Sequence, residues 1–71
     1  MAELIYHESY GDVTRKQLAA YRKYNISPSD HDDLVDIFGS ANHSEIVDAI
    51  IRTVNKHGRY GKDELSRDMD Y

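Results

Sequence analysis

Segment 42–58 carries the clearest alternation of apolar and polar positions in the chain. One face at helical spacing is apolar and consists of Ile46, Val47, Ile50, Ile51 and Val54. Asn42, followed three residues later by Glu45, is typical of a capping box, and Gly58 suits the left-handed position just beyond a helix. The pattern therefore predicts a helix over residues 43–57.

Two further helices are predicted upstream by their start signals. Thr14 with Gln17 forms another capping-box pattern and predicts a helix over residues 14–25. Ser27-Pro28 places a hydroxyl at the cap and a proline at the first helical position, where its missing N–H costs nothing. The helix that begins there should cover residues 28–38, because a glycine follows and interrupts the apolar pattern.

The first thirteen residues hold only a short apolar cluster, followed by Gly11. We expect a lead-in that packs Leu4 and Ile5 on one end of the helices, because a strand here would have no obvious pairing partner elsewhere. The sequence thus predicts an all-α fold, a compact three-helix bundle with a short N-terminal lead-in. Its core should consist of Leu18, Tyr21, Leu34, Phe38, Ile46, Val47, Ile50, Ile51 and Val54.

The segment after Gly58 is polar and leaves two alternatives open. Leu65 and Met69 lie about one helical turn apart, so residues 59–71 form either a short docking helix, the fourth of the chain, or a disordered tail. We therefore divide the chain into a helical domain, residues 1–58, and a polar tail, residues 59–71.

Composition narrows the class of protein. Seventy-one residues allow one domain with a small core, and the chain has no cysteine for a disulfide or a thiolate zinc site. The net charge of −4 disfavours a dedicated nucleic-acid binder, which usually carries a basic surface. Because no apolar stretch approaches the length of a membrane span or a signal-peptide core, we expect a cytoplasmic protein that does not bind membranes.

The net charge conceals a segregation of charges along the chain. Every charged residue between positions 13 and 29 is basic, and these are Arg15, Lys16, Arg22 and Lys23. Aspartates dominate positions 30–36, and the three that fall away from the apolar side of their helix are Asp32, Asp33 and Asp36. Such runs are most often the solvated faces of amphipathic helices. We nevertheless take these seven residues as the candidate partner-binding set.

Arg15 and Lys16 give a reason for that choice. They fall at the start of the first helix, where positive charge is unfavourable by roughly a few tenths of a kcal/mol. Either Glu8 or Asp12 offsets this charge, or an external anion does. A local rule broken without visible compensation often marks a functional constraint.

Side chains suited to catalysis or metal binding form no recognisable pattern. Asp30-His31-Asp32-Asp33 offers ligand-type groups, but neighbouring positions point apart on a helix. His31 falls on the apolar face of its helix, where a histidine is more often packed than a ligand. The sequence holds no zinc-protease, serine-hydrolase or phosphate-loop motif. We therefore expect no enzyme activity, no cofactor and no metal.

The function that fits best is a small non-enzymatic protein-interaction or regulatory module. It would act through its charged helix faces and its six tyrosines, because tyrosine is common at binding surfaces as well as at core edges. The partner would be a protein whose identity the sequence does not give. A homodimer through the apolar face of the third helix is also consistent with so small a core.

Nucleic-acid binding is the alternative function. It would use either the basic face of the first helix or the second and third helices as a weak helix-turn-helix unit. In the latter arrangement Glu45 and Asp48 would face phosphates, which is unfavourable.

Overall fold

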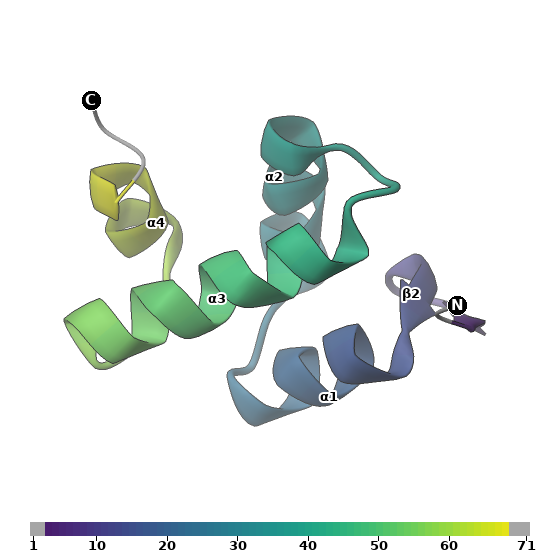
Figure 1. The fold of residues 1–71 in the computed structure, drawn as a ribbon. Helices are drawn as coiled ribbons and strands as arrows, with labels where there is room; N and C mark the ends of the chain where they lie inside the picture. Colours follow the sequence, from purple (N-terminus) through teal and green to yellow (C-terminus); the bar gives the residue numbers. More distant parts are fainter. Residues whose placement is uncertain (1–2, 69–71) are drawn as a thin grey trace.

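The computed structural model describes residues 3–68 and places a β-hairpin before a set of helices (Figure 1). The elements in this range are β1 (Leu4–His7), β2 (Gly11–Thr14), α1 (Arg15–Lys23), α2 (Pro28–Phe38), α3 (His43–His57) and α4 (Lys62–Asp68). α3 is the longest helix, and α1, α2 and α4 all pack against it. The predicted helical bundle is confirmed, including the helix bounds 28–38 and 43–57. Of the two alternatives for the tail, the short fourth helix is the one present.

The N-terminal segment is a β-hairpin, so the expectation of a lead-in without a strand is wrong. β1 pairs antiparallel with the segment directly downstream, with Leu4 opposite Thr14 and His7 opposite Gly11. Gly11 has a φ of 76°, the left-handed conformation that closes a three-residue hairpin loop. Leu4, which we expected in the core, is 49% exposed, and Val13 of β2 is buried instead.

Of the two predicted capping boxes, the one at Thr14 is present and the one at Asn42 is absent, and the predicted Ser27 cap is itself part of a capping box. The Thr14 hydroxyl accepts from the backbone N–H of Gln17 at 3.1 Å, and Gln17 Oε1 accepts from the N–H of Thr14 at 3.2 Å. Ser27 and Asp30 form the same reciprocal pair at the start of α2. The expectation that Asn42 caps α3 is wrong, because its side-chain amide donates to the last carbonyl of α2.

α1 ends at Lys23 rather than near residue 25 because the chain turns sharply there. Asn25 has a φ of 55°, and the backbone N–H of Ile26 donates to the carbonyl of Tyr21 at 2.9 Å. These are the features of a Schellman cap with asparagine in the left-handed position. The turn buries Ile26 in the core, although the helical periodicity did not select it.

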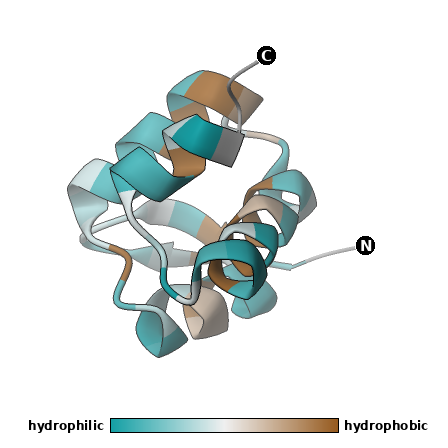
Figure 2. Cartoon of the chain, turned by 90° about the vertical axis from the view of Figure 1, so that its left-hand side faces the viewer, coloured by the Kyte–Doolittle hydropathy of each residue, from teal (hydrophilic) through white to brown (hydrophobic). Residues whose placement is uncertain are grey.

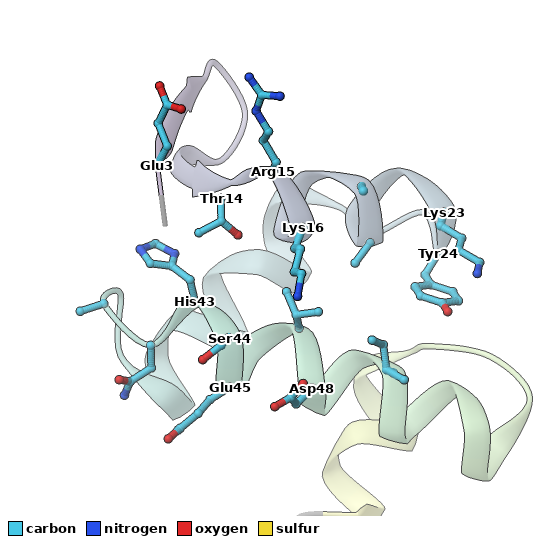
Figure 3. Close-up of a pocket in the computed structure, with 16 residues that line it drawn as sticks. Glu3, Thr14, Arg15, Lys16, Lys23, Tyr24, His43, Ser44, Glu45 and Asp48 are labelled. Atoms are coloured by element: carbon cyan, nitrogen blue, oxygen red, sulfur yellow. The ribbon is translucent and has the colours of Figure 1, made fainter. Parts of the chain in front are cut away.

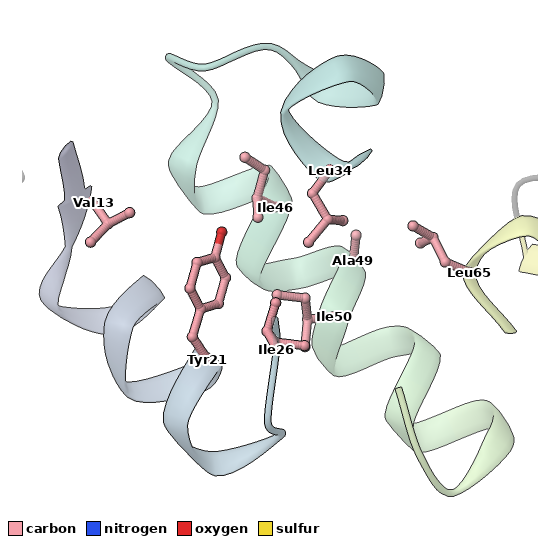
Figure 4. Close-up of a cluster of buried hydrophobic side chains, with 8 residues drawn as sticks. All are labelled: Val13, Tyr21, Ile26, Leu34, Ile46, Ala49, Ile50 and Leu65. Atoms are coloured by element: carbon pink, nitrogen blue, oxygen red, sulfur yellow. The ribbon is translucent and has the colours of Figure 1, made fainter. Parts of the chain in front are cut away.

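The core surrounds α3 and receives side chains from β2, from all the other helices and from the α1–α2 connection (Figure 4). Its buried apolar cluster consists of Val13, Tyr21, Ile26, Leu34, Ile46, Ala49, Ile50 and Leu65. Because Leu65 is 2% exposed, α4 is a docking helix. The other tail residue in that prediction, Met69, lies outside the described residues. The half-buried Leu18, Phe38 and Val54 pack around the cluster.

The apolar face of α3 is wider than the surface that its neighbours cover. Ile50 is fully buried, but Ile51 is 39% exposed, so its assignment to the core is wrong. Hydrophilic and hydrophobic stretches follow one another along the chain (Figure 2), and on α3 the exposed Ile51 brings one edge of the apolar stripe to the surface. This edge borders the candidate site.

Candidate interaction surface

Helices α1 and α3 lie side by side and flank an open groove of about 950 Å³, which we call the α1–α3 groove (Figure 3). Both helices run in the same general direction, with their N-termini at the same end. At that end, His43 Nδ1 on α3 lies 2.8 Å from Gln17 Oε1 on α1. The aliphatic residues that line the groove are Ala19, Ala20, Ala41, Val47 and Ile51.

The α1 rim of the groove is basic. Arg15, Lys16 and Lys23 line it, and all three are exposed. Lys23 Nζ lies 5.4 Å from the ring centroid of Tyr24, which also lines the groove. Arg22, the fourth cation of the predicted set, is exposed on the same helix but does not line the groove. The structure therefore divides the predicted basic set into three groove residues and one outside it.

The α3 rim is acidic, and sequence reasoning did not include its residues in the site. Glu45 and Asp48 line the groove opposite the α1 cations, with Lys16 and Asp48 projecting from opposite sides (Figure 3). In the sequence, Glu45 was assigned to a capping box with Asn42, and both carboxylates counted against DNA binding. The signal that could have found them is their position beside Val47 and Ile51 on one edge of α3.

The rim charges nearest the helix N-termini form no ion pair in the part of the chain that the structure describes. Within residues 3–68, none of Arg15, Lys16, Glu45 and Asp48 takes part in an ion pair. In particular, Asp12 and Glu8 form no such contact with the two cations at the start of α1. The unfavourable interaction of these cations with the helix dipole is therefore not offset by an internal ion pair.

The predicted aspartates of α2 do not join the groove. Asp32 and Asp36 are exposed on α2, and Asp33 is half-buried with its Oδ2 3.6 Å from Lys62 Nζ of α4. That ion pair links α2 to α4, so Asp33 has a structural role. The acidic partner of the basic α1 rim is α3, not α2.

A buried polar network lies behind the groove and connects three helices. The backbone N–H of Thr14 can only donate, so the Gln17 atom facing it must be the carbonyl oxygen. Gln17 Nε2 therefore donates to the Tyr21 hydroxyl at 2.8 Å, and the phenol donates to His31 Nδ1 at 2.6 Å. His43 Nδ1–H donates to the same Gln17 oxygen. The directions of the Gln17 bonds follow from the first, and the Tyr21 hydroxyl donates to His31 in the tautomer whose Nδ1 carries no proton.

Burial shifts the two titratable groups at the centre of this network. Desolvation raises the pKa of Tyr21 to about 12, and the hydrogen bond from Gln17 only partly opposes this. Desolvation also lowers the pKa of His31, although Asp32 acts in the opposite direction. Edge-to-face contacts with Tyr10 hold both rings, at centroid distances of 4.7 Å to Tyr21 and 5.6 Å to His31. The expectation that His31 is a packed residue is confirmed.

The arrangement offers surface contacts rather than a coordination site. Among residues 3–68, no three histidine, aspartate or glutamate side chains lie close enough together to hold a metal ion. In the same part of the chain, no helix combines the length and apolar character needed to cross a membrane. No protein-family model, curated protein or solved structure matches this chain.

Proposed function

We propose that this protein is a small non-enzymatic protein-interaction module that binds its partner in the α1–α3 groove. The observation that carries the proposal is Ile51, a large aliphatic side chain 39% exposed between two rims of opposite charge. Binding surfaces commonly combine an apolar centre with a polar rim. A partner that covers Ile51 and pairs with the rim charges would use both features.

Tyrosine supports the proposal at one position in the groove. Tyr24 lines it and is half-buried, so its ring can pack against a partner while its hydroxyl stays in water. Tyr21 is 1% exposed and belongs to the core instead. Tyr6 is exposed on β1 and does not line the groove.

The burial of the polar network supports a non-enzymatic function. Gln17 and Tyr21 are fully enclosed, and His31 is 8% exposed. Tyr21 and His31 have shifted pKa values and are hydrogen-bonded to each other, yet both have little access to a substrate in solution. Their contacts join the helices, which fits a structural role.

A protein partner is favoured over a nucleic acid because of the acidic rim. Arg15, Lys16 and Lys23 are exposed and suit phosphates, but Glu45 and Asp48 share their groove. A phosphate backbone seated there would lie beside two carboxylates, which repel it. A protein surface that presents charges of both signs meets no such conflict.

The proposal is tested by affinity capture from a lysate of the source organism after nuclease treatment. The bait proteins are the wild type, Arg15→Glu with Lys16→Glu, and Arg22→Glu as a matched control on the same helix outside the groove. We expect the double variant to lose the protein that the wild type and the control retain. Its melting temperature should stay the same or rise slightly, because the dipole conflict is removed.

Two results would contradict the proposal. One is retention of the same protein by the double variant, which would exclude the basic rim from the contact. The other is tight binding of labelled duplex DNA or RNA that weakens steeply with salt, by a log–log slope of roughly 0.9 per phosphate contact on duplex DNA. The latter would favour the nucleic-acid alternative.

A further inference from the structure

We infer that the partner in the α1–α3 groove is a second copy of this chain, bound about a two-fold axis that runs along the groove. This inference rests on the proposed function, since it assigns an occupant to the same surface. It begins from the opposite signs of the two rims, basic on α1 and acidic on α3. A surface that carries both signs on parallel rims can be complementary to itself.

The direction of the helices selects one orientation of the axis. α1 and α3 run side by side with their N-termini at the same end (Figure 3). A two-fold axis along the groove places α1 of each copy over α3 of the other and keeps each residue at its own level along the groove. An axis across the groove would place α1 over α1 and bring like charges together. Charge complementarity therefore favours the axis along the groove.

The predicted contacts follow from that symmetry. Lys16 lies at the level of Asp48 along the groove (Figure 3), so it faces the partner subunit's Asp48, and the reverse pair forms at the same time. Neither side chain has an ion pair within its own copy among residues 3–68. Both charges are therefore available to the second subunit.

Apolar residues of the groove add to the proposed contact. Ile51 and the small, exposed Ala19 line the groove from opposite helices, so the two copies can approach closely. A specific interface buries about 800 Å² per partner, roughly a sixth of the 4948 Å² surface of this chain. One face of the molecule is enough to supply that area.

Sedimentation equilibrium with charge-swapped variants tests the inference. We expect the wild type to shift with concentration from 8.2 kDa to twice that mass. Lys16→Glu and Asp48→Lys should each weaken the dimer by more than about tenfold, because each interface then holds two like-charge pairs. An equimolar mixture of the two variants should recover the dimer, since both cross-subunit pairs become complementary again. Arg22→Glu should behave as the wild type.

Two outcomes would overturn the inference. A wild type that stays monomeric over the whole concentration range would remove the dimer, and a mixture that stays monomeric while the wild type dimerises would remove this interface. Thermal melts of each variant show whether it is folded. If the wild type is monomeric and the groove still captures another protein, only the second copy is excluded. If capture also survives Arg15→Glu with Lys16→Glu, the proposed function fails as well.

Discussion

The hydroxyl oxygen of Tyr21 lies 2.6 Å from Nδ1 of His31, and this contact joins α1 to α2 inside the core. The same hydroxyl accepts from Gln17, so it uses both its donor and an acceptor position. Its ring also packs edge-on against Tyr10. The core is therefore held by directed polar contacts as well as by apolar packing, and several measurements can test this.

Tyr21→Phe should destabilise the fold by about 1–3 kcal/mol. The change keeps the ring but leaves the Gln17 amide and His31 Nδ1 buried without their shared partner, which is the cost of unsatisfied polar groups. Urea denaturation gives the free energy of unfolding. Tyr24→Phe is the matched control, because the Tyr24 hydroxyl makes no hydrogen bond within residues 3–68. Equal stabilities of the two variants would show that the network contributes nothing.

The free energy of unfolding should fall as the pH drops below about 6.5. The pKa of His31 is lowered in the folded state by burial, so the unfolded chain takes up the proton first. The contribution of His31 is fully present above 6.5 and is lost as the pH falls through the folded value. Asp32, Tyr10, Tyr21 and His43 surround the ring or act on it. His31→Gln should reduce this acid dependence, and an unchanged slope would contradict the assignment.

Stability should also fall at strongly alkaline pH. The pKa of Tyr21 is raised from 10.0 to about 12, so its contribution is fully present below 10.0 and is lost as the pH rises through the folded value. Burial also raises the pKa of Tyr60, so titration of tyrosine absorbance should show delayed ionisation of both rings, and Tyr21→Phe should leave only that of Tyr60. A set of rings that all ionise near pH 10.0 would contradict the burial of this hydroxyl.

Two adjacent isoleucines of α3 should respond very differently to truncation. Ile50→Ala should cost about 2–5 kcal/mol, because the side chain is fully buried and its removal leaves a cavity. Ile51→Ala should change the stability of the monomer by no more than about 0.5 kcal/mol, because its side chain is partly exposed. Thermal melts at low protein concentration measure both. Similar losses at the two positions would mean that the orientation of α3 is wrong.

The glycines that end α2 and α3 should differ in which residues can replace them. Gly58 has φ 80° and ψ −6°, a left-handed conformation that asparagine tolerates, so Gly58→Asn should cost less than Gly58→Ala. Gly39 has φ 91° and ψ 148°, a region close to one that only glycine adopts readily, so both substitutions should cost about 1–3 kcal/mol. A Cβ atom at either position would meet no close contact, so the cost of each substitution should come from the backbone conformation. Equal effects of asparagine at both sites would contradict this distinction.

The helices could be predicted well wherever their start and stop signals are local. Ser27 and Pro28 mark the start of α2, and Gly39 marks its end. Gly58 marks the end of α3. The hairpin was missed because its pairing depends on Gly11, which resembles a simple break in sequence. The second strand also begins Gly-Asp, two residues that are depleted in strands. The Schellman turn at Asn25 was missed for a similar reason, because hydrophobic periodicity does not show that a single residue takes the left-handed conformation.

Only the basic half of the candidate site could be predicted from the sequence. The basic row of α1 is visible in the sequence, because helical spacing gathers Arg15, Lys16 and Lys23 on one side. Its acidic counterpart was assigned to α2 because those aspartates are adjacent in the chain. Spacing gives the face of a helix on which a residue lies but not the helix that packs beside it. Only the packing of α3 against α1 brings Glu45 and Asp48 opposite the cations.

The most direct test of the central claim maps the contact surface on the folded protein. Amide chemical shifts of isotope-labelled protein are followed by NMR across a dilution series, and again after addition of any protein that affinity capture identifies. We expect the shift changes to concentrate at Lys16, Ala19, Asp48 and Ile51, with Leu65 of α4 unaffected. Changes confined to α2 and α4, with the groove residues unmoved, would contradict the assignment of the α1–α3 groove as the binding surface.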